Sequence, residues 1–192
     1  MFEYGAKFSR YTGLRAGQCL DIILDYKPRT VIDVGSGPGK HAEVMRKAGI
    51  DVTTISLSPP ADYVCDYLDY TGGAADIVWA SHILEHVQNV GEFIQWCKLY
   101  ALEKIAITVP PAKSEFVAGH INLFTAPTFC YTLIVSGLKI ERFGCYGYNM
   151  SAICSADKNP IDMSAPFDEV VSRMPFNAQH GFDSAPKNYK WP

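Results

Sequence analysis

The sequence predicts an α/β protein built around one mostly parallel β-sheet. Short apolar runs rich in β-branched residues alternate with helical patterns, as is typical of repeated strand–helix units. A glycine-rich turn directly follows the first of these runs, and two strands joined by a glycine- and tyrosine-containing loop end the alternation. We therefore expect seven strands, the last two of which form an antiparallel hairpin.

The expected strands are apolar runs that end at glycine, proline or polar residues. They are 31–34, 51–57, 63–65, 75–80, 105–109, 138–143 and 150–155. Too few residues separate the second strand from the third for an ordinary crossover helix. We therefore expect reduced helical structure between these two strands.

The expected helices have apolar positions at helical spacing and recognisable ends. They are 14–26, 40–48, 89–102, 125–137 and a short one at 168–174. Asn89 and Glu92 have the spacing of a capping box, and Thr125 is expected to be an N-cap. The predicted organisation is a single domain over 1–157, with an N-terminal helical lid at 1–28 and a proline-rich extension at 158–192.

The composition describes an ordinary globular protein. The 192 residues are 48% hydrophobic and 19% charged, with a formal net charge of −3. This charge gives no electrostatic footprint for nucleic acid, so nucleic-acid binding is not expected. No apolar run is long enough for a membrane-spanning helix. The six cysteines lack C-x-x-C spacing, which favours reduced thiols and a cytoplasmic location. The oligomeric state is left open.

The glycine turn reads D-x-G-x-G-x-G from Asp33 to Gly39. A phosphate-binding loop would need glycine at Val34 and a hydroxyl at His41, and a dinucleotide fingerprint would need glycine at Lys40. The sequence fails both tests. The turn instead resembles the first motif of the class I S-adenosylmethionine-dependent methyltransferases. The alternative is a tight strand-to-helix turn that binds no ligand.

Two further segments strengthen this resemblance. A-D-I-V-W-A-S-H-I-L-E-H-V, at 75–87, is similar to the fourth-strand motif of the methyltransferase type 11 group, and V-C-D-Y, at 64–67, is similar to the third-strand motif. The resemblance covers roughly residues 31–155. It implies a Rossmann-like methyltransferase sandwich, S-adenosyl-L-methionine as cofactor and a small-molecule acceptor.

The resemblance also implies a set of cofactor-binding residues near the carboxyl ends of the first four strands. These are Asp33, Gly35, Ser36, Gly37, Gly39, Ser56, Leu57, Asp66, Tyr67, Ala80 and Ser81. The glycine turn with Ser36 would cradle the methionine part, and Asp33 would orient the turn or reach the amino group. Ala80 and Ser81 would lie on the methionine side, near the sulfonium.

The adenosine part would lie on the second and third strands. The backbone around Leu57 would flank the ribose and adenine, and Asp66 would accept a hydrogen bond from the adenine amino group beside Tyr67. The other interpretation of Asp66 is a solvated turn residue. In the family an acid ends the second strand and binds both ribose hydroxyls, whereas this chain has Ser56 there.

The candidate catalytic residues are His120, His86 and His82, in loops expected after the fourth and fifth strands. Alignment provides most of the acceleration of methyl transfer, and a base that removes the acceptor's proton adds to it. His120 could be that base, because neutral imidazole accepts a proton near pH 7. Alternatively it binds a loop carbonyl, and His86 has a structural packing role.

A metal hypothesis concerns His82, Glu85 and His86. Their i, i+3, i+4 spacing places them on one face if the segment is helical. Some ubiquinone and small-RNA methyltransferases look similar, with E-x-x-E-H holding a divalent ion. His82 replaces the first acid here, so we do not assign a metal site from the sequence.

The leading functional prediction is methyl transfer to an oxygen or nitrogen of a small polar molecule. An RNA methyltransferase is an alternative that no basic stripe supports. A non-catalytic, methyltransferase-like cofactor-binding or partner subunit is another. Ser56 is the best argument for that subunit, and the His120 loop is the best argument against it.

Overall fold

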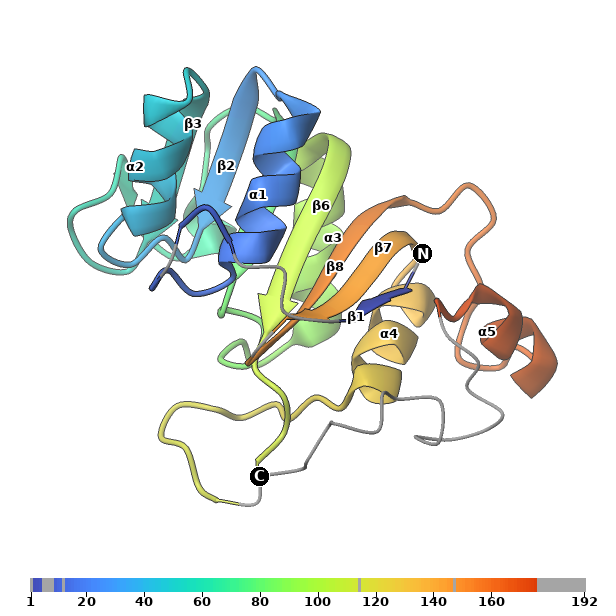
Figure 1. Ribbon diagram of the computed structural model, residues 1–192. Coiled ribbons are helices and arrows are strands. Elements are labelled where there is room, and N and C mark those ends of the chain that lie inside the picture. The colour runs from blue at the N-terminus through green and yellow to red at the C-terminus, as the bar shows by residue number, and fades with distance from the viewer. Residues whose placement is uncertain (1, 5–8, 12, 114, 147, 176–192) are drawn as a thin grey trace.

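The computed structural model describes residues 2–4, 9–11, 13–113, 115–146 and 148–175. Within these residues one sheet has the strand order β1-β7-β8-β6-β5-β2-β3-β4 (Figure 1). The strands are β1 (Phe2–Tyr4), β2 (Thr30–Val34), β3 (Asp51–Ser56), β4 (Tyr63–Val64), β5 (Ala75–Ser81), β6 (Ala101–Val109), β7 (Leu138–Tyr146) and β8 (Asn149–Ala156). All neighbouring pairs are parallel except those of β8, which runs antiparallel to β6 and β7.

The predicted fold class is confirmed. Strands β2 to β8 are the seven expected strands, and β7 and β8 form the expected hairpin. The additional strand β1 pairs with β7 at the sheet edge, with Phe2 opposite Phe143. Three residues are too few to show a strand pattern, so the sequence did not predict β1.

The helices begin and end close to the predicted residues. They are α1 (Gly17–Tyr26), α2 (Lys40–Lys47), α3 (Val90–Tyr100), α4 (Ala126–Val135), α5 (Phe167–Arg173) and a 3-10 helix at Tyr67–Asp69. Both predicted caps are present: the Asn89 side chain accepts a hydrogen bond from the Glu92 N–H, and the Thr125 side chain accepts one from the Thr128 N–H. The chain between β3 and β4 contains no helix, as expected.

Helices cover both faces of the sheet because neighbouring strand residues point to opposite sides. In β2, Val31 packs with α1 and α2, whereas Ile32 belongs to the larger core formed with α3 and α4. Figure 1 shows α1 and α2 on the near side of the sheet and α3 behind β6. None of the described helices is long and apolar enough to cross a membrane.

The two terminal segments are described in part. The buried side of α1 lies on the sheet, with Leu20 and Ile23 fully enclosed. After β8, Ile161 and Val170 pack against Ile134 of α4. Residues 5–8 and 12 of the predicted lid, and 176–192 of the predicted extension, lie outside the described residues. The lid and the domain boundaries therefore stay predictions.

The strand register brings four strand ends to one edge of the sheet. Val34, the last residue of β2, lies opposite Ile55 of β3 and Ala80 of β5. Ser56, which ends β3, lies opposite Val64 of β4. Ligands of open α/β sheets bind at such carboxyl ends.

Candidate functional site

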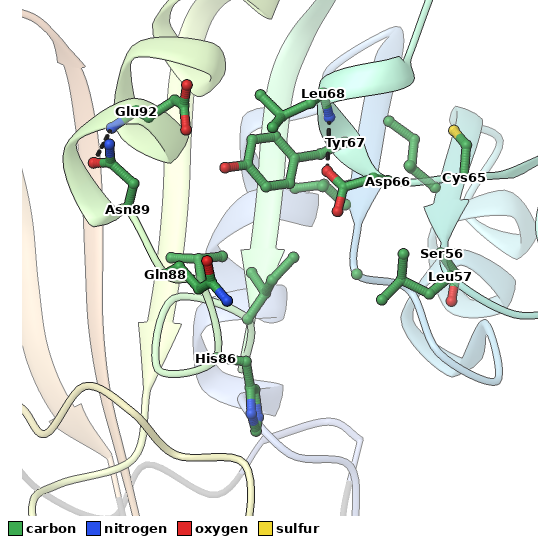
Figure 2. Close-up of a pocket in the computed structure, with 15 residues that line it drawn as sticks. Ser56, Leu57, Cys65, Asp66, Tyr67, Leu68, His86, Gln88, Asn89 and Glu92 are labelled. Atoms are coloured by element: carbon green, nitrogen blue, oxygen red, sulfur yellow. Dashed lines mark hydrogen bonds between the residues drawn. The ribbon is translucent and has the colours of Figure 1, made fainter.

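A cavity of about 480 Å³ opens at this edge, between the glycine turn and the beginning of α3. Its volume lies within the range of roughly 300–1,000 Å³ that is typical of ligand pockets. Figure 2 shows Ser56 and Leu57 on one side, Asn89 and Glu92 on the other, and His86 at the lower end.

Gly35 of the glycine turn lines the cavity, and the shape of the turn depends on its glycines. Gly35, Gly37 and Gly39 have φ angles of 73°, 51° and 74°, in the left-handed region that other residues rarely adopt. A Cβ atom on Gly35 would lie 2.8 Å from Cδ1 of Ile83. A Cβ atom on Gly37 or Gly39 would meet no atom within 4 Å. A ligand can therefore approach the backbone of Gly37 and Gly39 closely.

Two buried polar atoms of the turn have no hydrogen-bond partner among the described residues: the Ser36 hydroxyl and Oδ2 of Asp33. Burial raises the pKa of Asp33 to about 7, although the Ala42 backbone N–H, at the start of α2, stabilises its charged form. Asp33 thus links the turn to α2. The donors and acceptors left over fit a polar ligand such as the methionine part of S-adenosylmethionine.

Ser56 is the last residue of β3. It follows Ile55, whose carbonyl accepts hydrogen bonds from the N–H groups of Gly35 and Ser36 at 2.8 and 3.1 Å. Its hydroxyl accepts only a long hydrogen bond, 3.4 Å, from the Ser58 N–H. Leu57 next to it is 77% exposed, so its backbone is accessible at the cavity rim.

Asp66 and Tyr67, which follow β4, form a further part of the wall. Oδ1 of Asp66 accepts a hydrogen bond of 3.0 Å from the Leu68 N–H and caps the 3-10 helix. The Tyr67 ring lies edge-to-face on Phe93, with centroids 5.0 Å apart, and burial raises its pKa. Both side chains border the cavity in Figure 2. Asp66 is therefore a turn cap that also lines the site.

The structure brings six predicted site residues to the cavity wall: Gly35, Ser56, Leu57, Asp66, Tyr67 and His86. The other predicted residues are not in the wall: Asp33, Ser36, Gly37, Gly39, Ala80, Ser81, His82 and His120. Of these, Ala80 is fully buried in the sheet, and the Ser81 hydroxyl lies 3.0 Å from that of Thr108.

Sequence reasoning missed a second group of lining residues. These are Val34, Ile55, Cys65, Leu68, Ile83, Val87, Gln88, Asn89 and Glu92. The apolar members carry no recognisable signal, because they look like core residues. Asn89 and Glu92 were identified only as a helix cap, although the loop that follows the fourth predicted strand leads to them and was a usable signal.

The three candidate histidines have different environments. His86 lines the cavity, and its Nδ1 atom lies 2.7 Å from the Gly119 carbonyl oxygen. The His120 ring packs edge-to-face on it, with centroids 4.9 Å apart. His82 contacts two other residues: its Nε2 atom lies 2.6 Å from Oδ1 of Asn149, on the hairpin, and its Nδ1 atom lies 3.2 Å from Oε1 of Glu85. His86 and His120 therefore form one group, beside the buried carboxylate of Glu85.

The sequence matches the model of a family described as a methyltransferase domain over residues 11–142. No curated protein has a significantly similar sequence. Many solved structures are similar to this one. A 1,6-didemethyltoxoflavin-N1-methyltransferase from Burkholderia thailandensis, with bound 1,6-didemethyltoxoflavin and S-adenosylhomocysteine, has a TM-score of 0.66 and 14% identity, over 73% of this chain and 77% of that chain.

Two further similar structures also contain a bound cofactor. A magnesium protoporphyrin IX methyltransferase from Synechocystis PCC 6803, with bound S-adenosylmethionine, has a TM-score of 0.56 and 16% identity, over 73% of this chain and 79% of that chain. An S-adenosylmethionine-dependent methyltransferase from Bacteroides fragilis, with S-adenosylhomocysteine, has a TM-score of 0.57 and 17% identity, over 72% and 77%. At these identities the likeness establishes a shared fold.

Proposed function

Because this chain belongs to the methyltransferase domain family and is an S-adenosylmethionine-dependent methyltransferase, we propose that it methylates an oxygen or nitrogen of a small polar molecule. The observation that carries this proposal is the position of His86. It lines the cofactor cavity and also contacts His120, so polar groups that can act on an acceptor directly adjoin the cofactor.

The cofactor binds along the edge of the sheet. The methionine part lies on the glycine turn at Gly35, Gly37 and Gly39, with Ser36 as a further polar contact and Asp33 as the residue that orients the turn. The two buried polar atoms without partners support this placement, because a bound amino acid group would supply their hydrogen bonds.

The adenosine part fills the cavity. Ser56 and the backbone of Leu57 contact the ribose, and Asp66 and Tyr67 contact the adenine. Ala80 and Ser81 lie on the methionine side at the end of β5, near the sulfonium. This assignment is supported by the register of β2, β3 and β5, which aligns the ends of these strands.

On the acceptor side, His120 and His86 promote the departure of the acceptor's proton while the methyl group is transferred. The loop that carries His120 follows β6, whose carboxyl end lies at the same edge as those of β2 and β5. His82 acts indirectly, through its contact with Glu85. A small acceptor is favoured over RNA because the net charge of −3 provides no attraction for phosphates. The six unpaired cysteines support a cytoplasmic location.

The proposal is tested by incubating the protein with methyl-labelled S-adenosylmethionine and a metabolite extract, followed by fractionation. We expect the label in the small-molecule fraction. Label in RNA or protein would contradict a small-molecule acceptor. Cofactor binding without any label transfer would favour the non-catalytic alternative.

A further inference from the structure

Three potential metal ligands gather beside the cofactor cavity. One ligand atom from each of Glu85, His86 and His120 lies within 4.8 Å of the other two. Glu85 and His86 come from the turn after β5, and His120 comes from the long loop after β6. The tertiary fold, rather than a local spacing, therefore creates this cluster.

Hydrogen bonds hold the two segments of the cluster together. The Glu85 carbonyl accepts hydrogen bonds of 2.9 and 3.1 Å from the N–H groups of Ile121 and Asn122. The Asn122 side chain donates to the carbonyls of Leu84 and Val87 at 3.3 and 2.7 Å. These contacts fix the loop at its His120 end, so the ligands are arranged in advance of binding.

The imidazole of His86 is oriented in the manner of a metal ligand. A carbonyl oxygen can only accept, so the contact of Nδ1 with the Gly119 carbonyl places a proton on Nδ1. In the neutral ring the Nε2 atom then has a free lone pair. This Nε2 atom lies 3.9 Å from Oε1 of Glu85. Metal-binding histidines typically donate their other N–H to a carbonyl or carboxylate in this way.

The buried side chain of Glu85 independently indicates that the cluster binds a cation. Its side chain is 1% exposed, and neither carboxylate oxygen has a hydrogen-bond partner among the described residues. A buried carboxylate in this state is costly unless a cation neutralises it. Its nearest positive candidate within the protein is His82, whose Nδ1 atom lies 3.2 Å from Oε1.

We propose that Glu85, His86 and His120 bind a divalent first-row transition metal such as Zn²⁺. Two imidazoles and one carboxylate suit such metals better than magnesium, and they leave a coordination position open. This set differs from the sequence hypothesis of His82, Glu85 and His86. Nδ1 of His82 also lies 3.2 Å from Oε1 of Glu85, but among the described residues the ligand atoms that all lie within 4.8 Å of one another come from Glu85, His86 and His120.

A metal bound at this cluster would take part in the proposed methyl transfer, and this part of the inference rests on the proposed function. An acceptor hydroxyl or amine at the open position would lose its proton more readily, because a bound divalent metal lowers the pKa of its ligands. His86 and His120 would then promote proton loss as metal ligands rather than as free bases. The binding of the metal itself does not depend on the acceptor.

The test uses the full chain without an affinity tag, stripped of metal and free of cofactor and acceptor. Zn²⁺ is titrated calorimetrically, and Co²⁺ is added as a probe whose visible absorption reports its ligands. We expect one equivalent to bind to the natural protein. Glu85→Gln and His120→Ala should bind at least ~100-fold more weakly, since even outer-sphere partners of metal ligands contribute about 10–100-fold.

A matched variant serves as the control, with folding checked by circular dichroism. His41→Gln removes a histidine whose Nε2 atom contacts the Arg15 carbonyl. It should keep the metal affinity of the natural protein within a few-fold. Absence of stoichiometric binding, or unchanged affinity in folded Glu85→Gln and His120→Ala, would overturn the proposal and leave an ion pair of Glu85 with His82.

The failures of the two proposals can be told apart. Metal uptake without methyl transfer to any small molecule would reject the proposed function and keep the metal site. Methyl transfer that survives in metal-free protein, together with no uptake of Zn²⁺ or Co²⁺, would reject the metal site and keep the function.

Discussion

The carboxylate of Asp62 is held by Thr54. Its Oδ2 atom accepts hydrogen bonds from the Thr54 N–H at 2.8 Å and from the Thr54 hydroxyl at 2.7 Å. Arg46 donates to the same oxygen at 2.7 Å, and these contacts lower the pKa of Asp62 despite its partial burial. Asp51 begins β3 and lies at the other end of that strand from Ser56. Neither acid can therefore replace the missing ribose carboxylate at Ser56.

We accordingly expect Ser56→Asp to strengthen cofactor binding. Hydrogen bonds to charged groups contribute about 1.5–3 kcal/mol, against about 0.5–1.5 kcal/mol for neutral ones. The difference, on the order of 1–2 kcal/mol, corresponds to roughly five- to thirty-fold tighter binding. Calorimetric titration with S-adenosylhomocysteine measures it. Ser58→Asp, which adds the same charge on an exposed neighbour, should not tighten binding. Equal or weaker binding by Ser56→Asp would mean that the ribose is held elsewhere.

We expect His120→Ala to lower kcat far more than it changes cofactor affinity, because His120 does not line the proposed cofactor cavity. Loss of a group that promotes proton removal typically costs ~10²–10⁴-fold. Steady-state kinetics on the identified acceptor, with a separate cofactor titration, separates the two effects. Unchanged turnover would reduce His120 to a structural residue of its loop.

The buried carboxyl of Asp33 should make stability depend on pH. Its pKa is raised from 3.8 to about 7 in the folded state, so the folded protein retains a proton that the unfolded chain releases. Its destabilising contribution therefore grows from about pH 4 to about pH 7 and is constant above. Asp33→Asn should gain stability relative to the natural protein over this window. One pKa unit is about 1.4 kcal/mol, so a gain of several kcal/mol at pH 8 is the upper expectation.

Thermal unfolding of both proteins at pH 4, 6 and 8, without cofactor, measures the effect. Asp76→Asn is the control. Backbone N–H groups of Arg29 and Thr30 donate to Asp76 and lower its pKa below 3.8, so nearly all of its stabilising contribution is present by pH 4. This variant should therefore be less stable than the natural protein by a nearly constant amount at pH 4, 6 and 8. A difference between Asp33→Asn and the natural protein that does not change with pH would contradict the raised pKa.

Much of the fold could be predicted from local patterns. β-Branched runs identified β2 and β3, and the side chains of Asn89 and Thr125 marked the starts of α3 and α4. The three-residue strand β1 could not be predicted, because it depends on its pairing with β7 and has no pattern of its own. The repeated strand–helix units thus predicted the fold class, whereas the edge strand β1 could not be predicted.

The part of the candidate site that directly follows the ends of strands was predictable. The glycine turn, Ser56 and Asp66 follow directly from strand ends, and the structure places each at the predicted edge. The contact of His86 with His120 was not predictable, because it depends on the path of a long loop without periodicity. The cluster of Glu85, His86 and His120 depends on the same loop, and the hypothesis for His82, Glu85 and His86 stays a prediction.

The central claim is that the cofactor binds on the glycine turn. Its most direct test compares cofactor binding in Gly37→Val and Gly49→Val. Both glycines have positive φ angles, 51° and 85°, and a Cβ on either meets no atom within 4 Å. Each variant therefore has a similar backbone cost, about 1–2 kcal/mol or more. Gly49, however, follows the C-terminal end of α2, whereas the glycine turn precedes the N-terminal end of that helix.

Calorimetric titration with S-adenosylhomocysteine, on variants shown to unfold cooperatively, gives the answer. The cofactor is expected against the Gly37 backbone, so Gly37→Val should show no binding while Gly49→Val binds like the natural protein. Equal affinity of the two variants would contradict the account, because the cofactor would then not lie on the glycine turn.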